Sequence, residues 1–168
     1  MAMNSASMRL YVVLLASVPA CSSCDSARAP AGDKHVAPSA APVFVRGPSG
    51  GAAIAPFVAE EVKKAARPGA VLVYVGASWC EPCQYFHKAV TSGQLDTLLR
   101  GVRLIEFDSD ADHSSLSAAG YGSKLIPLLA VPKPDGTASE RRIEGSIKGP
   151  DAVQLNMVPR IAALLQQP

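Results

Sequence analysis

Residues 70–83 read AVLVYVGASWCEPC, and this stretch decides the fold. Its first six residues form a continuous β-favouring apolar run, which is typical of a strand covered on both faces of a sheet. A short loop then leads to Cys80-Glu81-Pro82-Cys83, and the residues up to Val90 are predicted to form a helix. A Cys-x-x-Cys at a strand-to-helix junction of an α/β chain indicates a thiol–disulfide redox motif.

The expected position of each cysteine suggests its chemistry. Cys80 should lie at the helix N-terminus, where unpaired amides and the positive end of the helix dipole stabilise a thiolate. Cys83 follows one turn later, close enough for a disulfide, and should be more buried. We therefore expect Cys80 to attack a substrate disulfide and Cys83 to break the mixed disulfide. Pro82 suits an early helical position, and Glu81 opposes the thiolate less than the fixed dipole favours it.

Two alternative roles for these cysteines are a structural disulfide that undergoes no exchange and half of a zinc site. Cys21 and Cys24 form a second Cys-x-x-Cys, but it lies far outside zinc-ribbon spacing from Cys80. We therefore predict no metal, and no cofactor other than the redox-active Cys80–Cys83 disulfide. Cys24 is left open as a free thiol, a second acylation site or a partner in an intermolecular disulfide.

Strands and helices alternate around this motif. We expect a helix from Phe57 to Pro68-Gly69, a helical turn or two over 94–100, a weak helix over 112–119, and a final helix over 150–165 kinked near Pro159; further strands are expected over 102–107, 128–131 and 140–144. This order predicts an α/β fold with a mixed central sheet and helices on both faces.

The N-terminal segment predicts export. Residues 10–18, LYVVLLASV, follow Arg9 and are too short to span a bilayer as a helix, but they fit a signal-peptide core. Small residues suit cleavage after Ala20, and residues 16–21 resemble a bacterial lipobox in which Cys21 becomes lipidated. We predict a lipoprotein-type signal peptide over 1–20 and a periplasmic, membrane-anchored protein. Ordinary soluble secretion, with Cys21 incidental, is the alternative.

Residues 21–56 are predicted to be a flexible linker. They are rich in Ala, Pro, Gly and Ser and show no helical or strand period, so they should not bury enough surface to offset their ordering entropy. The folded domain is expected over 57–168, preceded by this disordered tether.

The charge balance argues against nucleic acid as a partner. The 16 basic and 14 acidic side chains leave a formal net charge of +2, which creates no strong field. The composition also excludes a coiled coil, a multispan membrane protein and a highly charged disordered chain.

Residues 71–83 resemble the active-site strand and loop of the thioredoxin family. Leu125-Ile126-Pro127-Leu128 stands where thioredoxins carry a cis-proline preceded by Ile, and Pro134-Asp135-Gly136 and Gly145 stand at the family's hairpin turn and following glycine. The resemblance covers 57–168 and implies the thioredoxin fold.

By this resemblance Pro127 is cis and lies against Cys80, and the backbone of Ile126 pairs with an extended substrate segment. Tyr74 replaces the buried acid found six residues before the first active cysteine in thioredoxins, which removes a proton acceptor for the resolving thiol. Glu81 replaces the usual Gly, and Leu128 replaces the usual Thr. Cys-Glu-Pro-Cys resembles the membrane-tethered reductases of cytochrome c maturation (ResA/TlpA type), whereas residues 78–108 are more similar to periplasmic domains such as the C-terminal one of DsbD.

The expected function is therefore an exported thiol–disulfide oxidoreductase. Its partners would be protein thiols and disulfides and an unidentified electron donor or acceptor. Reduction of exported disulfides is the first choice, and oxidase or isomerase activity is the second. Trp79 is expected to cover the site, and Pro127 is expected to form the substrate platform. A non-catalytic binding module of the same fold is the alternative.

Two histidines carry weaker signals. His87 follows Cys80 on roughly the same helix face and is interpreted as a packed or surface histidine rather than a proton shuttle or ligand. His113 and the acidic loop 108–112 are interpreted as a polar connection in which Asp112 caps the weak helix, rather than a metal site. The spacing of Cys80 and Cys83 does not fit a thioredoxin-fold copper chaperone.

Overall fold

The computed structural model of the protein describes residues 41–67 and 69–166. The predicted signal peptide over 1–20, the predicted lipidation site Cys21, Cys24 and the predicted linker up to residue 40 lie outside the described residues. Among the helices of the described ranges, none has the length and apolar character that crossing a membrane requires.

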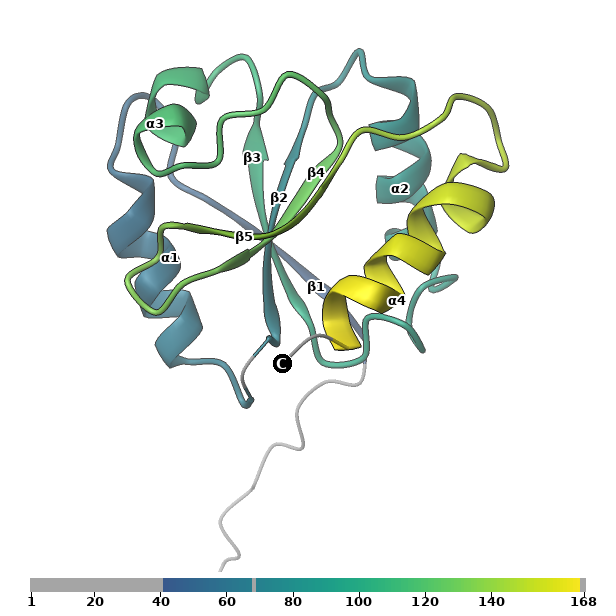
Figure 1. Ribbon diagram of the computed structural model, residues 1–168, viewed down its shortest axis with the longest axis horizontal. Coiled ribbons are helices and arrows are strands. Elements are labelled where there is room, and N and C mark those ends of the chain that lie inside the picture. The colour runs from purple at the N-terminus through teal and green to yellow at the C-terminus, as the bar shows by residue number, and fades with distance from the viewer. Residues whose placement is uncertain (1–40, 68, 167–168) are drawn as a thin grey trace, which may run out of the picture. The chain divides into compact units, whose positions relative to one another are not determined.

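Within the described residues, five strands form one mixed sheet in the order β1-β3-β2-β4-β5 (Figure 1). The strands are β1 (Val43–Arg46), β2 (Val71–Gly76), β3 (Arg103–Asp108), β4 (Leu128–Pro132) and β5 (Ala138–Glu144). Strands β1 and β2 run parallel to β3, β4 runs antiparallel to β2, and β5 runs antiparallel to β4. The predicted mixed central sheet is confirmed.

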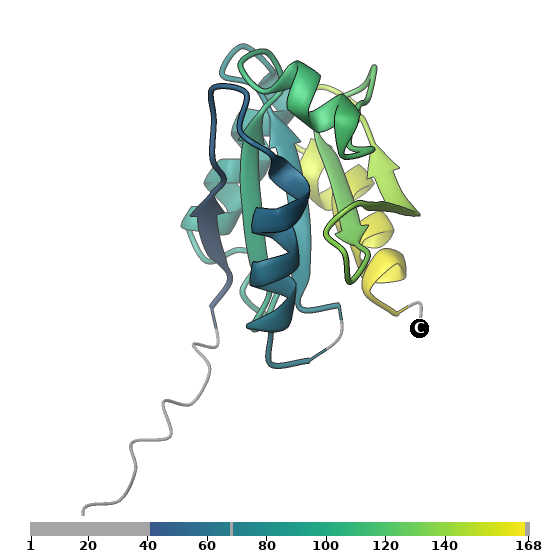
Figure 2. The ribbon, with the colours of Figure 1, turned by 90° about the vertical axis from the view of Figure 1, so that its left-hand side faces the viewer.

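Helices cover both faces of the sheet, as predicted. Figure 1 shows α1 (Ile54–Lys63) and α3 (His113–Ala118) on one side, and Figure 2 places them in front of the sheet. The other side carries α2 (Glu81–Thr91), a π-helical turn η1 (Val153–Met157) and α4 (Val158–Gln166) (Figure 1). This arrangement is the thioredoxin fold that the resemblance implied.

Strand β2 is the buried centre of the sheet, which explains its continuous apolar sequence. Leu72 and Tyr74 belong to the hydrophobic core beneath α2 and α4, whereas Val71, Val73 and Val75 belong to the core beneath α1 and α3. Burying an aliphatic side chain of this size stabilises the fold by about 1.5–3 kcal/mol. A strand between two helical layers therefore needs apolar residues at successive positions rather than at alternate ones.

The folded domain begins earlier than the sequence predicted. Strand β1 lies inside the segment assigned to the linker, where it pairs in parallel with Arg103–Glu106 of β3, and α1 begins at Ile54 rather than Phe57. The apolar run around Phe44 is too short to predict a strand by itself, because its stability comes from pairing with β3 and from packing on the core. The linker prediction is therefore corrected from residue 43 onward.

Two local predictions also differ from the structure. Asp112 makes no capping hydrogen bond to α3; its Oδ2 instead accepts the N–H of Asp108 at 3.2 Å, so it closes the preceding loop. Near Pro159 the helix is not simply kinked: a π-helical turn precedes α4, and the N–H of Val158 donates to the carbonyl oxygen of Val153. Pro159 has no N–H to donate, so an irregularity was predictable there, but its type was not.

Candidate active site

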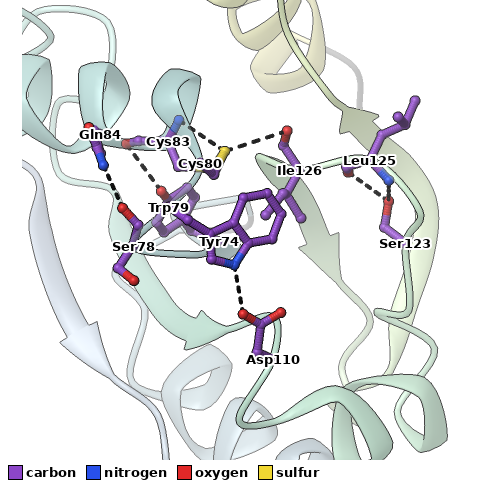
Figure 3. Close-up of a disulfide and its surroundings, with 10 residues drawn as sticks. All are labelled: Tyr74, Ser78, Trp79, Cys80, Cys83, Gln84, Asp110, Ser123, Leu125 and Ile126. Carbon is purple, nitrogen blue, oxygen red and sulfur yellow. Dashed lines mark hydrogen bonds between the residues drawn. A yellow bond between two sulfur atoms is a disulfide. The ribbon is translucent and has the colours of Figure 1, made fainter.

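Cys80 and Cys83 lie where β2 passes into α2 and form a disulfide (Figure 3). Their Cα atoms are 5.2 Å apart, within the range that a disulfide spans. Cys80 is the N-cap residue of α2, and Pro82 lies in the first turn. The predicted position of the motif at the helix start is confirmed, while the chemical roles of the two cysteines stay predictions.

The start of α2 provides a favourable electrostatic environment for negative charge on Cys80. The Sγ of Cys80 accepts the N–H of Cys83 at 3.3 Å, and this N–H is one of the amides that a helix start leaves without a helical partner. In the reduced protein, the same amide and the helix dipole would stabilise a thiolate at this sulfur. Both cysteines are largely buried, 4% and 2% exposed, so a substrate sulfur has to approach closely between the surrounding loops.

Trp79 directly precedes Cys80 and is 66% exposed. Its indole Nε1–H donates to Oδ2 of Asp110 at 2.7 Å (Figure 3). Asp110 lies in the loop after β3, so this hydrogen bond links that loop to the loop between β2 and α2, which carries Trp79. In the sequence, Asp110 is only part of a polar connection, because nothing in its local sequence places it beside a residue 31 positions earlier.

The loop before β4 faces the disulfide. The Ile126–Pro127 bond is cis, as the resemblance implied. The carbonyl oxygen of Ile126 lies 3.8 Å from Sγ of Cys80 (Figure 3). Ser123 stabilises the turn before Ile126, since its hydroxyl accepts the N–H of Leu125 and donates to the carbonyl oxygen of Leu125.

Glu81 connects α2 to a third loop, the one after β5. Its Oε1 accepts the N–H of Gly149 at 3.1 Å. Each of the three loops around the disulfide exposes a large apolar side chain: Trp79, Leu125 and Ile147. We call these three side chains the apolar rim.

A cleft of about 460 Å³ reaches the motif from another direction, and its lining includes Cys83, Tyr74, His87 and Glu106. The hydroxyl of Tyr74 donates to the carbonyl oxygen of Cys83 at 3.4 Å. Burial, and secondarily the charge of Glu106, raise the pKa of Tyr74 well above its ordinary value. His87 Nε2 lies 3.7 Å from Glu106 Oε1, and its ring stacks on Phe44 with centroids 4.5 Å apart.

The structure thus brings most of the predicted site residues together. Cys80, Cys83, Trp79, Glu81 and Pro82 lie at one end of α2, and the Ile126–Pro127 bond lies next to them. Sequence reasoning did not anticipate the contributions of four others: Asp110, Ile147, Phe44 and Glu106. In the described ranges, no group of three or more His, Cys, Asp or Glu side chains is placed to hold a metal ion, and His113 is simply the first residue of α3.

Comparison with known proteins gives fold likeness only. No protein-family model matches the chain, and no curated protein matches its sequence. A solved structure of a single-substitution mutant thioredoxin from Halobacterium salinarum NRC-1 is 21% identical, with a TM-score of 0.45 over 79% of this chain and 97% of that one. A thioredoxin from Trichomonas vaginalis is 23% identical, with a TM-score of 0.46 over 74% of this chain and 94% of that one.

Proposed function

We propose that this protein is an exported thiol–disulfide oxidoreductase that reduces disulfides in other exported proteins. The observation that carries the proposal is the Cys80–Cys83 disulfide at the N-terminus of α2, with Cys80 as the capping residue. A purely structural disulfide needs neither a helix start that stabilises a thiolate nor a surrounding apolar rim.

The reaction begins with the reduced protein. The Cys80 thiolate attacks one sulfur of a substrate disulfide, and the other substrate sulfur leaves as a thiolate. Cys83, as its thiolate, then attacks Sγ of Cys80, and the bond from Cys80 to the substrate breaks. The substrate gains two electrons and two protons, and the protein ends with the Cys80–Cys83 disulfide. A thiol electron donor must reduce this disulfide before the next cycle.

The surroundings of Cys80 support a protein disulfide rather than a small-molecule disulfide as the substrate. The apolar rim offers three side chains from three different loops to an approaching polypeptide. The Ile126 carbonyl beside Sγ of Cys80 supports the proposal that an extended segment pairs with this backbone next to Pro127. The Trp79–Asp110 and Glu81–Gly149 hydrogen bonds restrain two sides of this surface.

Export, periplasmic location and anchoring through Cys21 are proposed from the leader sequence. Within the thioredoxin-like proteins, the Cys-Glu-Pro-Cys core favours a membrane-tethered reductase of the ResA/TlpA type. A role similar to the DsbD C-terminal domain is the alternative. Mass spectrometry of the mature N-terminus tests the anchor: a diacylglyceryl group on Cys21 is expected, and an unmodified Cys21 contradicts it.

Trapping of substrates tests the proposed chemistry. In a Cys24→Ser background, which keeps Cys21 for the proposed anchor, the Cys83→Ser variant should accumulate mixed disulfides between Cys80 and exported proteins, because the resolving step is lost. Cys80→Ser in the same background is the matched control and should trap far less. All adducts should disappear on addition of a reducing agent.

The absence of adducts, together with an unreactive Cys80, would contradict the enzyme proposal and favour a non-catalytic binding module. The reduction potential of the Cys80–Cys83 pair then tests direction. A value near about −270 mV supports a reductase, whereas a value near about −120 mV makes the protein an oxidant.

A further inference from the structure

The proposed reaction requires a base for Cys83, and Tyr74 does not provide one. Before Cys83 attacks the mixed disulfide, its thiol must lose a proton, because the thiolate is the nucleophile. Tyr74 stands where the resemblance to thioredoxins places a buried acid, and its hydroxyl donates to the carbonyl oxygen of Cys83. Burial, and then the charge of Glu106, raise the pKa of Tyr74, so the phenol keeps its own proton at neutral pH.

The cleft connects Cys83 to other titratable groups. Its lining includes Cys83 but not Cys80, so it approaches the resolving cysteine rather than the attacking one. A volume of about 460 Å³ accommodates several waters, since one water occupies about 30 Å³ in the liquid. Water filling this cleft would give a proton from Cys83 a path toward His87 rather than past Cys80.

His87 is the group in this cleft best suited to receive that proton. Histidine exchanges protons near neutral pH more readily than other side chains. Stacking on Phe44 fixes the His87 ring, and Glu106 Oε1 lies 3.7 Å from its Nε2. The other charged side chains lining the cleft are Arg46 from β1, Lys88 from α2 and Asp108 from β3.

We propose that His87 accepts the proton of the Cys83 thiol through water in this cleft, and that Glu106 is its positioning residue. The inference rests on the proposed function. In the resolving step the Cys83 proton moves through water to His87, and the Cys83 thiolate forms a bond to Sγ of Cys80. The bond from Cys80 to the substrate breaks, and its electron pair leaves with the substrate sulfur. That thiolate takes a proton from solvent, and His87 later returns its proton to solvent.

The two steps are separable with Ellman's reagent, an aromatic disulfide. In the reduced full chain carrying Cys21→Ser and Cys24→Ser, attack by Cys80 releases one thionitrobenzoate, and resolution by Cys83 releases the second. Cys83→Ser should abolish the second release and so assign it. The variant to compare is His87→Phe, because phenylalanine keeps a ring to stack on Phe44 but exchanges no proton.

We expect His87→Phe to leave the first release within about twofold of the parent rate and to slow the second by about tenfold or more near pH 6–7. The deficit should shrink as the pH rises, since hydroxide then deprotonates the Cys83 thiol directly. Glu106→Gln should give a smaller slowing. Lys88→Gln, which changes a charge on the same cleft, is the matched control and should not slow the second release.

Several outcomes overturn the inference. If the second thionitrobenzoate is released by His87→Phe at the parent rate at every pH, His87 takes no proton from Cys83. If His87→Phe slows the second release by the same factor at every pH, the substitution acts through packing instead. If His87→Phe fails to fold by circular dichroism, His87→Gln is measured in its place against the same criteria. A parent chain that releases no thionitrobenzoate contradicts the proposed function itself, and the inference with it, whereas a reactive parent with an unaffected His87 variant contradicts the inference alone.

Discussion

Replacing Phe44 by alanine tests whether β1 belongs to the folded domain. Phe44 is partly buried against the core beneath α2, its ring centroid lies 5.9 Å from that of Tyr74, and it stacks on His87. Truncating a fully buried phenylalanine costs about 3–5 kcal/mol. Partial burial reduces this to roughly half, and loss of the aromatic contacts adds about 0.5–1.5 kcal/mol. We therefore expect the free energy of unfolding to fall by about 2–4 kcal/mol.

The assay is urea denaturation of the oxidised full chain, followed by far-ultraviolet circular dichroism. The midpoint should fall while the slope against urea stays unchanged, because the surface exposed on unfolding is nearly the same. With an unfolding entropy of about 2.1 cal/mol/K per residue, a domain of about 125 residues should lose roughly 8–15 °C in Tm. Val43→Ala on the same strand is the matched control, since Val43 is exposed. A loss below about 0.5 kcal/mol for Phe44→Ala would refute the docking of β1, because ordinary surface substitutions cost that little.

Two further predictions concern the stability of the domain. Burial raises the pKa of Glu61, but hydrogen bonds from Lys64 and Arg103 outweigh burial and leave that pKa below its ordinary value. The ionised carboxylate therefore stabilises the fold above its unfolded-state pKa, and this contribution is lost as the pH falls through its lowered folded-state pKa. In urea titrations, Glu61→Gln should lower the free energy of unfolding by about 1.5–3 kcal/mol at pH 7 and by progressively less in acid. A loss of stability that does not change with pH would contradict this. Gly136 has a φ of +80°, and an added Cβ would collide with the backbone of α1, so Gly136→Ala should destabilise the fold by more than about 2 kcal/mol. Gly50→Ala, at a similar φ but in open space, is the control and should cost only about 1 kcal/mol in the same thermal melts; equal losses for the two variants would refute the collision.

The central part of the fold was predictable because its signals are local. An unbroken apolar run indicates strand β2, and Cys80 and Pro82 indicate the start of α2, so their order along the chain already places the two sulfurs at a helix N-terminus. No long-range contact has to be known for this prediction. The same holds for the β4–β5 hairpin, whose turn carries Pro134 and Gly136.

The surroundings of the motif were not predictable in this way, because they depend on contacts between distant segments. Phe44 lies in an Ala- and Pro-rich stretch whose composition indicates a linker, and only the pairing of β1 with β3 brings it onto His87. Asp110 lies in an acidic loop to which the sequence assigns no function, and only the fold places it beside the indole of Trp79. Residue type alone does not indicate such partners, since each is ordinary in its own neighbourhood.

The lining of the cleft beside Cys83 includes Gly76 as well as Tyr74. Residues 74 and 76 project from the same face of β2, because side chains alternate along a strand. A Cβ on residue 76 would collide with the Tyr74 hydroxyl, so only glycine leaves the phenol room to reach over this position to the carbonyl of Cys83. The route that we propose for the Cys83 proton thus depends on two residues outside the Cys-x-x-Cys motif, and a chain with the same motif but a larger residue at position 76 should lack it.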